Sequence, residues 1–284
     1  MKMRYSQTLR TTRNGITSVV AYTLLVLAAA LAVLPIVWMV LSSFKQLEDM
    51  FVVPLRWLPH PWYFGAYPEA WAQRDFTRYF LNSAFVSICI TVGNVFLCSL
   101  AGYAFAKFRF FGRQFFFLVV LSTLMLPLEV TMVPLFLTVK QFNWQNTYWG
   151  MIVPFIADAF GVFLMRQYIM GIPDELMEAA RIDGMSEFGI FTRIVFPLSR
   201  PAAIALSIFT FREAWDMYIW PLVIITKEDL RPLTVGLALF MSNYGTIWNQ
   251  LLAVATIAML PLTILFFCLQ RYFIRGIVLS GLKG

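Results

Sequence analysis

The sequence predicts an all-α protein that crosses a membrane six times as a single domain over residues 1–284. Hydrophobic residues make up 60% of the chain and charged residues 13%, whereas about a quarter of the residues in a soluble domain are charged. A helix needs about 20 apolar residues to cross the hydrocarbon core of a bilayer. Six stretches reach that length, at residues 19–41, 79–106, 115–139, 148–170, 202–225 and 250–273.

The first of these stretches follows a basic tail, as the apolar core of a secretory signal peptide does. It is longer than such a core and no small-residue cleavage site follows it, so we expect a retained helix. The next connection, residues 42–78, is rich in prolines and aromatic residues, which favours a compact loop at the membrane interface. Residues 226–249 form the other large connection on the same side.

The distribution of positive charge predicts which side each connection faces. Fourteen of the 22 Lys and Arg residues lie in the N-terminal tail, between the second and third spans, around residues 171–200 and at the C-terminal end. Seven lie in the connections on the opposite side. Since cytoplasmic connections carry the excess of Lys and Arg, both termini and residues 171–200 are expected to be cytoplasmic. The net charge of +7 is then mainly a topology signal. No basic stripe with interleaved aromatic residues indicates a nucleic acid partner.

The polar loop at about residues 171–200, between the fourth and fifth spans, is the most informative segment. A proline and two acidic residues suit a first helical turn, and Gly184 can take the left-handed conformation that ends a helix. These features predict a helix over residues 174–183. Ala179 and Ala180 are expected to leave a shallow notch on it, where another backbone can come close.

A second short helix is expected after the turn. Ser186 suits its N-cap, and the helix is expected to run to about Val195. Pro197 and Pro201 are expected to end it before the next apolar span. The two helices together predict a helix-turn-helix on the membrane surface.

This loop carries a recognisable sequence pattern. It contains Glu178-Ala179-Ala180-Arg181-Ile182-Asp183-Gly184, followed after nine residues by Ile194-Val195-Phe196-Pro197. The run resembles the EAA loop of permease subunits in binding-protein-dependent ABC importers, which have a MetI-like fold. That pattern is Glu-Ala-Ala, three residues, Gly, nine residues, Ile, any residue, Leu-Pro. Only the last pair departs from it here, because Phe196 replaces the leucine.

Other runs are similar to the carbohydrate-importing branch of these permeases, and within it to the maltose-type second subunit with six spans. They cover most of residues 75–284. The matching runs are Phe80-Leu81-Asn82-Ser83, Ala101-Gly102-Tyr103-Ala104-Phe105-Ala106, Met125-Leu126-Pro127-Leu128-Glu129-Val130, Trp215-Asp216-Met217-Tyr218-Ile219-Trp220-Pro221-Leu222 and Gln270-Arg271-Tyr272-Phe273-Ile274-Arg275-Gly276. The branch often has Trp-Asn where this chain has Trp215-Asp216.

The resemblance implies a multi-pass permease subunit in the cytoplasmic membrane. Its implied partners are a second, non-identical permease, two ATPase subunits that bind ATP and Mg²⁺, an external solute-binding protein, the sugar substrate and membrane lipids. It also implies that the EAA loop inserts into a groove on the ATPase surface. The coupling residues carried over are Glu178, Ala179, Ala180, Asp183 and Gly184. The alanines would allow close approach, Glu178 would supply a charge-assisted contact, and Gly184 would set the angle between the two helices.

Charged side chains inside the predicted spans mark a candidate translocation pathway, because each is costly in lipid and is expected to face the bundle or a wet cavity. Arg212 and Asp216 are one helical turn apart and can pair, with Glu213 on the adjoining strip. Carboxylates beside the aromatic face of Trp215 suit a polyol. The alternative is an internal ion pair that fixes helix packing and never meets substrate. Two further carboxylates near helix-disrupting prolines are Glu129 and Asp158.

No enzyme chemistry is expected in this chain. It contains no Gly-x-x-x-x-Gly-Lys-Ser/Thr phosphate cradle, so ATP is expected to bind to a separate subunit. Three cysteines inside spans and a single histidine, His60, form neither a metal-ligand cluster nor a catalytic set, and no cofactor or metal is expected. The C-terminal tail, with Arg275 and Lys283, is expected either to reach the ATPase pair or to hold the membrane surface.

Three alternatives to a carbohydrate importer remain open at this point. A glycerol-phosphate or phosphodiester importer would belong to the same branch, but Arg212 is the only basic residue deep in a span, which favours a neutral sugar. An ion-coupled secondary transporter is expected to have internal repeats, and none is evident. A membrane-anchored scaffold would not explain so many charges within spans.

Overall fold

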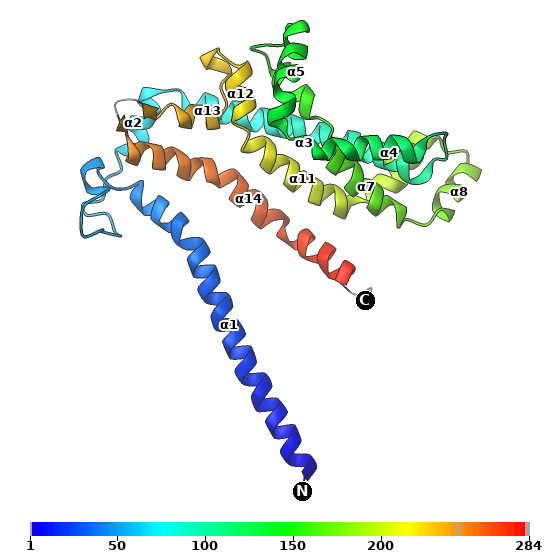
Figure 1. Ribbon diagram of the computed structural model, residues 1–284, viewed down its shortest axis with the longest axis horizontal. Helices are drawn as coiled ribbons and strands as arrows, with labels where there is room; N and C mark the ends of the chain where they lie inside the picture. The colour runs from blue at the N-terminus through cyan, green and yellow to red at the C-terminus, as the bar shows by residue number, and fades with distance from the viewer. Residues whose placement is uncertain (1, 243–244, 282–284) are drawn as a thin grey trace. The chain divides into compact units, whose positions relative to one another are not determined.

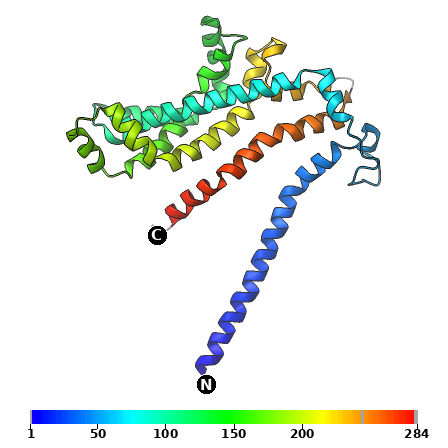
Figure 2. The same ribbon diagram turned by 180° about the vertical axis from the view of Figure 1, so that it is seen from behind.

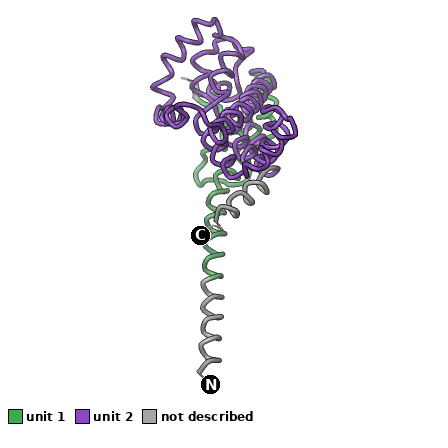
Figure 3. Tube along the Cα trace, turned by 90° about the vertical axis from the view of Figure 1, so that its right-hand side faces the viewer, with its two compact units in different colours: residues 1–73, 240–257 green, residues 74–239, 258–284 purple. Residues whose placement is uncertain are grey.

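The computed structural model describes residues 2–242 and 245–281, and the side chains of residues 18–240 and 246–268. The regular secondary structure of the described chain is helical apart from one antiparallel pair of two-residue strands, which confirms the predicted all-α class. It divides into two compact units, coloured green and purple in Figure 3. Unit 1 comprises residues 1–73 and 240–257, and unit 2 comprises residues 74–239 and 258–284. The organisation as a single permease domain stays a prediction.

Unit 1 begins with a long helix, whose segment Ser18–Ser42 is apolar enough to cross a membrane. The side chains of residues 18–37 are exposed all round it. A helix that is apolar and exposed on every side is expected in lipid or against another membrane chain.

The elements of unit 1 are α1 (Lys2–Ser42), the 3₁₀ turn η1 (Leu47–Asp49), α2 (Ala66–Gln73), β1 (Met241–Ser242), β2 (Gly245–Thr246) and the first part of α14 (Trp248–Gly281), labelled in Figure 1 where space allows. In the strand pair, Met241 lies opposite Thr246 and Ser242 opposite Gly245.

Unit 2 holds most of the helices and receives the later part of α14. Its other elements are α3 (Phe76–Lys107), α4 (Arg113–Ser122), η2 (Thr123–Met125), α5 (Leu128–Gln141), α6 (Tyr148–Ile152), η3 (Val153–Phe155), α7 (Ala159–Met170), α8 (Glu175–Ile182), α9 (Glu187–Ile190), the π-helical turn η4 (Phe191–Val195), α10 (Phe196–Leu198), α11 (Arg200–Trp215), α12 (Ile219–Ile224), η5 (Glu228–Leu230) and α13 (Leu233–Ala238).

The core of unit 2 forms where α3 packs against α7 and α11, which run beside it in Figures 1 and 2. Glycines permit the close approach of α3 and α7. A Cβ atom on Gly102 would lie 2.8 Å from the backbone nitrogen of Arg166, and one on Gly161 would lie 2.7 Å from Sγ of Cys98. Small residues at helix contacts matter in a membrane, because lipid tails are as apolar as the side chains and close van der Waals packing must hold the helices together.

The described helices provide three spans, or up to six, the number that the sequence predicts, when each bent helix pair is counted as one span. Three single helices are long and apolar enough to cross a membrane: Ser18–Ser42, Phe76–Lys107 and Trp248–Cys268. Three bent helix pairs pass the same test when each is taken as one span. These are Arg113–Met125 with Leu128–Gln141, bent by 106°, Tyr148–Phe155 with Ala159–Met170, bent by 42°, and Glu187–Leu198 with Arg200–Trp215, bent by 79°.

Prolines explain where the paired helices bend. A proline has no N–H to donate, and its ring clashes with the carbonyl four residues earlier in a helix. Pro127 immediately precedes α5 at the first bend, and Pro154 lies in the turn η3 before the second. Pro201 lies in the first turn of α11, after the third bend.

The second helix of the EAA loop runs past its predicted end at about Val195. It continues through the π-helical turn to Leu198. A π turn adds one residue to the helical turn, and here the N–H of Phe196 bonds the carbonyl of Phe191. The chain can therefore pass Pro197 within a helix. The bend comes at Ser199, where Pro201 follows in the position that a new helix favours.

The fifth span is shorter than the predicted range 202–225. The helix α11 ends at Trp215, and α12 begins after a break. A continuous helix would bring the ring of Pro221 against the carbonyl of Met217. That carbonyl instead accepts a hydrogen bond of 2.6 Å from the hydroxyl of Thr234. The predicted span extended past Trp215 because the segments on both sides of the break, α11 and α12, are hydrophobic.

The contact between α3 and α7 yields a test. Gly102→Val should destabilise the protein by about 1–3 kcal/mol or more, because the added atoms meet backbone and overpacked cores cannot relax freely. The midpoint of thermal unfolding in detergent measures this. Gly171→Ala is the matched control, since a Cβ there lies 3.4 Å from its nearest neighbour, the carbonyl of Tyr168. Equal unfolding midpoints for both variants would contradict the packing argument.

Candidate functional site

The EAA loop, residues 171–200, forms a helix-turn-helix whose first half matches the prediction closely. The helix α8 spans Glu175–Ile182, within the predicted range 174–183. Gly184 has a φ of +80°, in the left-handed region. The hydroxyl of Ser186 accepts a hydrogen bond of 3.2 Å from the backbone N–H of Gly189, which confirms it as the N-cap of the second helix.

The turn between the two helices is closed by two backbone hydrogen bonds. The N–H of Met185 bonds the carbonyl of Ala180 at 2.9 Å, and the N–H of Gly184 bonds the carbonyl of Arg181 at 3.0 Å. This is the pattern of a Schellman motif, which requires a left-handed residue just past the helix. Gly184 supplies that conformation without the strain that a Cβ atom would bring.

Two side chains near the C-terminal end of α3 hold the EAA loop. The ammonium group of Lys107 donates to the carbonyl of Ile172 and to Oδ1 of Asp174, the latter at 2.6 Å. This hydrogen bond lowers the pKa of Asp174. The hydroxyl of Tyr103 donates to Oε2 of Glu187 at 3.0 Å. Lys107 therefore fixes the start of α8, and Tyr103 fixes the start of α9.

An ion pair braces the two loop helices against each other. Nε of Arg181 lies 2.6 Å from Oε1 of Glu187, and Nη2 lies 3.3 Å from Oε2. A bidentate pair of this kind sets an angle as well as a distance. Because Glu187 also accepts from Tyr103, the brace and the attachment to α3 share one carboxylate. Sequence reasoning missed this network, since Tyr103 lies far from the loop in the chain.

The predicted coupling residues do not all face the same way. Glu178, Ala179, Asp183 and Gly184 are exposed. Ala180 is only 5% exposed and belongs with Met177 to the core of unit 2. The expectation that both alanines form a notch for a partner was therefore wrong for Ala180, which packs against its own chain. The exposed side of α8 also carries Leu176 and Ile182.

The EAA loop and the connection after α12 lie at opposite ends of α3. Lys107 near the last turn of α3 contacts the start of the loop. Near the first turns, the side-chain amide of Asn82 donates to the carbonyls of Asp229 and Arg231, both at 3.0 Å. Figures 1 and 2 show α8 beyond one end of α3 and α13 beside the other. A helix of this length, about 1.5 Å per residue, exceeds the thickness of a hydrocarbon core.

A cavity of about 130 Å³ lies between α3, α11 and the start of α7, and it has both apolar and polar residues in its lining. Its polar lining consists of Asn94, Asp158, Thr210 and Glu213. Asp158 caps α7 by accepting from the N–H of Gly161 at 2.6 Å, and it also accepts from the side-chain amide of Asn94. Thr210 donates to the other end of that amide at 3.3 Å. Glu213 reaches the same cavity, which has two carboxylates and no basic side chain in its lining.

The structure separates the predicted pathway residues. Arg212 and Asp216 pair as predicted, with 3.3 Å between Nε and Oδ2, but they are exposed and do not line the cavity. Trp215 is buried, and its indole N–H donates to the carbonyl of Ala258 at 3.0 Å, so it presents no free face to the cavity. Glu129 is exposed in the first turn of α5, away from the cavity lining. Of the pathway candidates that the sequence indicated, Glu213 and Asp158 line it.

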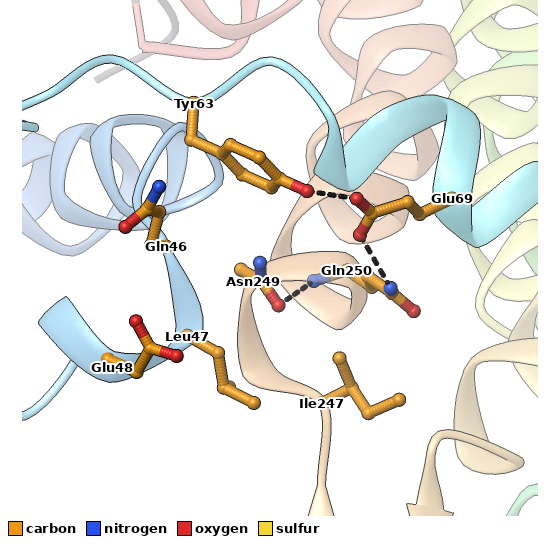
Figure 4. Close-up of a pocket in the computed structure, with 8 residues that line it drawn as sticks. All are labelled: Gln46, Leu47, Glu48, Tyr63, Glu69, Ile247, Asn249 and Gln250. Atoms are coloured by element: carbon orange, nitrogen blue, oxygen red, sulfur yellow. Dashed lines mark hydrogen bonds between the residues drawn. The ribbon is translucent and has the colours of Figure 1, made fainter.

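Unit 1 contains a second, larger polar pocket of about 330 Å³. Figure 4 shows its lining, which consists of Gln46, Leu47, Glu48, Tyr63, Glu69, Ile247, Asn249 and Gln250. The hydroxyl of Tyr63 donates to one oxygen of Glu69, and the side-chain amide of Gln250 donates to the other at 3.0 Å. No sequence motif indicated this pocket, because its residues come from three separate segments.

The described residues contain no cluster of candidate metal ligands. Among those residues, no three His, Cys, Asp or Glu side chains lie close enough to share an ion. The predicted role of the C-terminal tail cannot be placed, because Lys283 and the side chain of Arg275 lie outside the described residues.

Comparison with known proteins places these features in context. Residues 94–279 match the family model described as binding-protein-dependent transport system inner membrane component. The fold is similar to a chain in the crystal structure of a bacterial ABC transporter involved in the import of the acidic polysaccharide alginate, with a TM-score of 0.80. The similarity covers 91% of this chain and 96% of that chain at 24% identity.

Two curated relatives align over most of their length. The arabinooligosaccharides transport system permease protein of Halalkalibacterium halodurans is 38% identical over 259 residues, which is 90% of this chain and 93% of the relative. The sn-glycerol-3-phosphate transport system permease protein of Pectobacterium atrosepticum is 36% identical over 239 residues, 81% of this chain and 85% of the relative.

The two alanines of the EAA loop give a paired test. Ala180→Leu should destabilise the purified protein by about 1–3 kcal/mol, because the larger side chain overpacks a core position. Ala179→Leu, at an exposed position, should change stability by no more than about 0.5 kcal/mol. Thermal unfolding of the isolated chain in detergent measures both. A larger loss for Ala179→Leu would mean that the faces of α8 are assigned the wrong way round.

Proposed function

The chain belongs to the family of binding-protein-dependent transport system inner membrane components, and on that premise we propose that it is the permease subunit of an ATP-driven importer for a neutral carbohydrate or related polyol. ATP hydrolysis takes place in two separate ATPase subunits. A second, non-identical permease and an external solute-binding protein complete the transporter. The relative named for arabinooligosaccharide transport supports the substrate class.

The exposed face of the EAA loop supports the contact with an ATPase. Ala179, Asp183 and Gly184 are exposed beside Glu178, while the buried side of α8 joins the core of unit 2. A force applied to the exposed side therefore acts on a loop that is attached to α3 at Lys107 and Tyr103. This attachment is the observation that carries the proposal, because a transmitting element must be joined to what it moves.

The direction of coupling follows from linkage between nucleotide binding and the state of the spans. ATP closes the ATPase pair, which draws the EAA loops of the two permeases together. The spans then change from an inward-open to an outward-open arrangement. ATP shifts the population toward the outward-open state because it binds that state more tightly than the inward-open state.

The distribution of positive charge supports a cytoplasmic EAA loop and cytoplasmic termini. The loop and the connection that contains Asp229 contact opposite ends of α3. If α3 spans the membrane, these two connections face opposite sides. The pocket in unit 1 then belongs to the external side, together with residues 42–78.

The cavity between α3, α7 and α11 is the proposed contact with passing substrate. Glu213 and Asp158 place carboxylates at its wall, and hydroxyl groups of a sugar can donate to such oxygens. The exposed pair of Arg212 and Asp216 would be costly in lipid, so the partner permease or an aqueous path covers it in the assembled transporter.

A glycerol-phosphate importer is the second candidate, favoured by the relative named for sn-glycerol-3-phosphate transport. A phosphate needs basic groups or free backbone N–H groups around it. The lining of the cavity contains no basic side chain, and its two carboxylates repel an anion. Import of labelled substrates by the reconstituted transporter with its binding protein separates the two. ATP-dependent uptake of an arabinooligosaccharide supports the proposal, and uptake of sn-glycerol-3-phosphate alone would overturn the substrate class.

Gly184 provides the test of coupling. Gly184→Val should leave membrane insertion intact but reduce substrate-stimulated ATP hydrolysis at least about tenfold, because a β-branched residue is strained at this positive φ and will distort the turn. Gly184→Asn is the matched control, since asparagine tolerates the left-handed region. Hydrolysis is measured on the assembled transporter in liposomes. Normal coupling in Gly184→Val would count against the role of the turn.

Glu213 and Glu129 test the pathway, because both are carboxylates within predicted spans and only Glu213 lines the cavity. Glu213→Gln should slow uptake about tenfold through loss of a charge-assisted hydrogen bond to substrate. Glu129→Gln should leave uptake within about twofold of the unaltered transporter, as an exposed substitution away from the site. Initial uptake rates in proteoliposomes provide the measurement. Equal effects of the two substitutions would remove the cavity from the pathway.

A further inference from the structure

The pocket of unit 1 is built from three segments that converge on one space. Gln46 and Glu48 come from the connection after α1, and Asn249 comes from the first turn of α14. Tyr63 precedes α2, and Glu69 lies within it. Figure 4 shows these side chains arranged around the opening. The pocket lies wholly within unit 1 and is distinct from the cavity between α3, α7 and α11.

One wall of the pocket is held by a continuous set of hydrogen bonds. Both oxygens of Glu69 are occupied, one by the hydroxyl of Tyr63 and the other by the amide of Gln250. The oxygen of that same amide accepts from the amide of Gln73 at 2.7 Å. The hydrogen bond to Glu69 raises the pKa of Tyr63, which keeps its hydroxyl a donor. This wall is therefore fixed before any ligand arrives.

Asn249 supplies a buried polar group with unused capacity. The residue as a whole is only 4% exposed, and its side-chain oxygen accepts from the backbone N–H of Gln250 at 3.0 Å. The nitrogen of the same amide points toward the space beside Gln46 and Tyr63 in Figure 4. Within the described residues this nitrogen has no hydrogen-bond partner. This nitrogen is not one of the fully buried side-chain atoms that lack a partner, so solvent reaches it and it is free to donate to a ligand atom in the pocket.

The remaining free groups of the pocket restrict the chemistry of its ligand. Glu48 offers an acceptor and Gln46 offers both a donor and an acceptor, and neither has a partner in the described part of the chain. An anion would meet the carboxylates of Glu48 and Glu69. A cation would leave the donor of Asn249 unsatisfied, because a cation has no lone pair to accept a hydrogen bond. Hydroxyl groups donate and accept at once, so a neutral polyhydroxylated ligand satisfies every free group.

We propose that this pocket binds one sugar unit of a neutral carbohydrate, as a site separate from the membrane cavity. The proposal rests on the proposed function, because the imported carbohydrate is the ligand meant. It places a first contact with substrate in unit 1, outside the predicted spans. The ring of Tyr63 forms part of the wall, and aromatic rings commonly cover the apolar face of bound ligands in such sites.

The test uses the assembled transporter in nanodiscs made only of phosphatidylcholine, so that no glycolipid headgroup competes. Saturation-transfer NMR with arabinotriose is expected to give a signal, and titration gives its dissociation constant. Asn249→Asp should weaken binding at least about tenfold, since it keeps the oxygen that caps Gln250 but replaces the free donor with a negative charge. Glu48→Gln, which keeps an acceptor but removes the charge, should weaken binding less.

Arg56→Gln is the matched control, because it changes the net charge by the same amount in the same unit and does not line the pocket. It should bind arabinotriose as the unaltered chain does. Coelution of every variant with the other subunits shows that it assembles. An unchanged signal in Asn249→Asp would overturn the proposal, as would equally strong binding of sn-glycerol-3-phosphate that this substitution abolishes.

Failure of this proposal differs from failure of the proposed function. If the transporter imports arabinooligosaccharides but Asn249→Asp binds arabinotriose normally, the pocket assignment is wrong and the function stands. If the transporter imports no carbohydrate, the substrate class is wrong, whatever the pocket binds.

Discussion

The attachment of the EAA loop to the C-terminal end of α3 is the interaction on which the account depends. Tyr103 and Lys107 lie one helical turn apart, and each holds the start of one loop helix. Arg181 and Glu187 then brace the two helices together. Each of these polar contacts alone is worth little, since the charged groups are partly exposed. Their arrangement matters more than their energy, because three contacts define the orientation of a rigid body.

The local conformation of the EAA loop was predictable because short-range rules decide it. A proline and acidic residues favour a helix start, Ser186 favours an N-cap, and Gly184 permits a left-handed turn, and the structure has each of these where the sequence predicts it. The direction of the alanines was not predictable. Helical spacing says which residues share a face, but only the position of α3 and its neighbours decides that Ala180 is the buried one.

The spans show the same division between local and long-range information. Their number followed from the length of the apolar runs, but the end of the fifth span did not. Hydrophobic residues continue past Trp215, and the break depends on Pro221 together with a distant hydroxyl on Thr234 that satisfies the freed carbonyl of Met217. The inward packing of Trp215 was not predictable for a related reason. An aromatic residue beside charges can face a cavity or pack inward, and its partner, the carbonyl of Ala258, is remote in the chain.

The polar sites illustrate why pockets are the hardest features to predict. Asp158 was a candidate because it is a carboxylate near a proline, yet its position in the cavity depends on Asn94 and Thr210 from two other helices. The pocket of unit 1 draws on three segments, none of which carries a motif. The pocket of unit 1 and the cavity beside α3 are both lined by carboxylates and by no Lys or Arg side chain, which suits a neutral molecule.

The central claim is that the EAA loop moves with α3 as one stiff body. Spin labels at Val92→Cys in α3 and Ile182→Cys in the loop, both exposed positions, measure this in a chain whose native cysteines are replaced by alanine. Double electron–electron resonance on the assembled transporter gives the distance distribution with and without ATP. A single narrow distribution that nucleotide leaves unchanged is the predicted result. A distribution that broadens or shifts with ATP would show that the loop moves independently of α3, and would contradict the account.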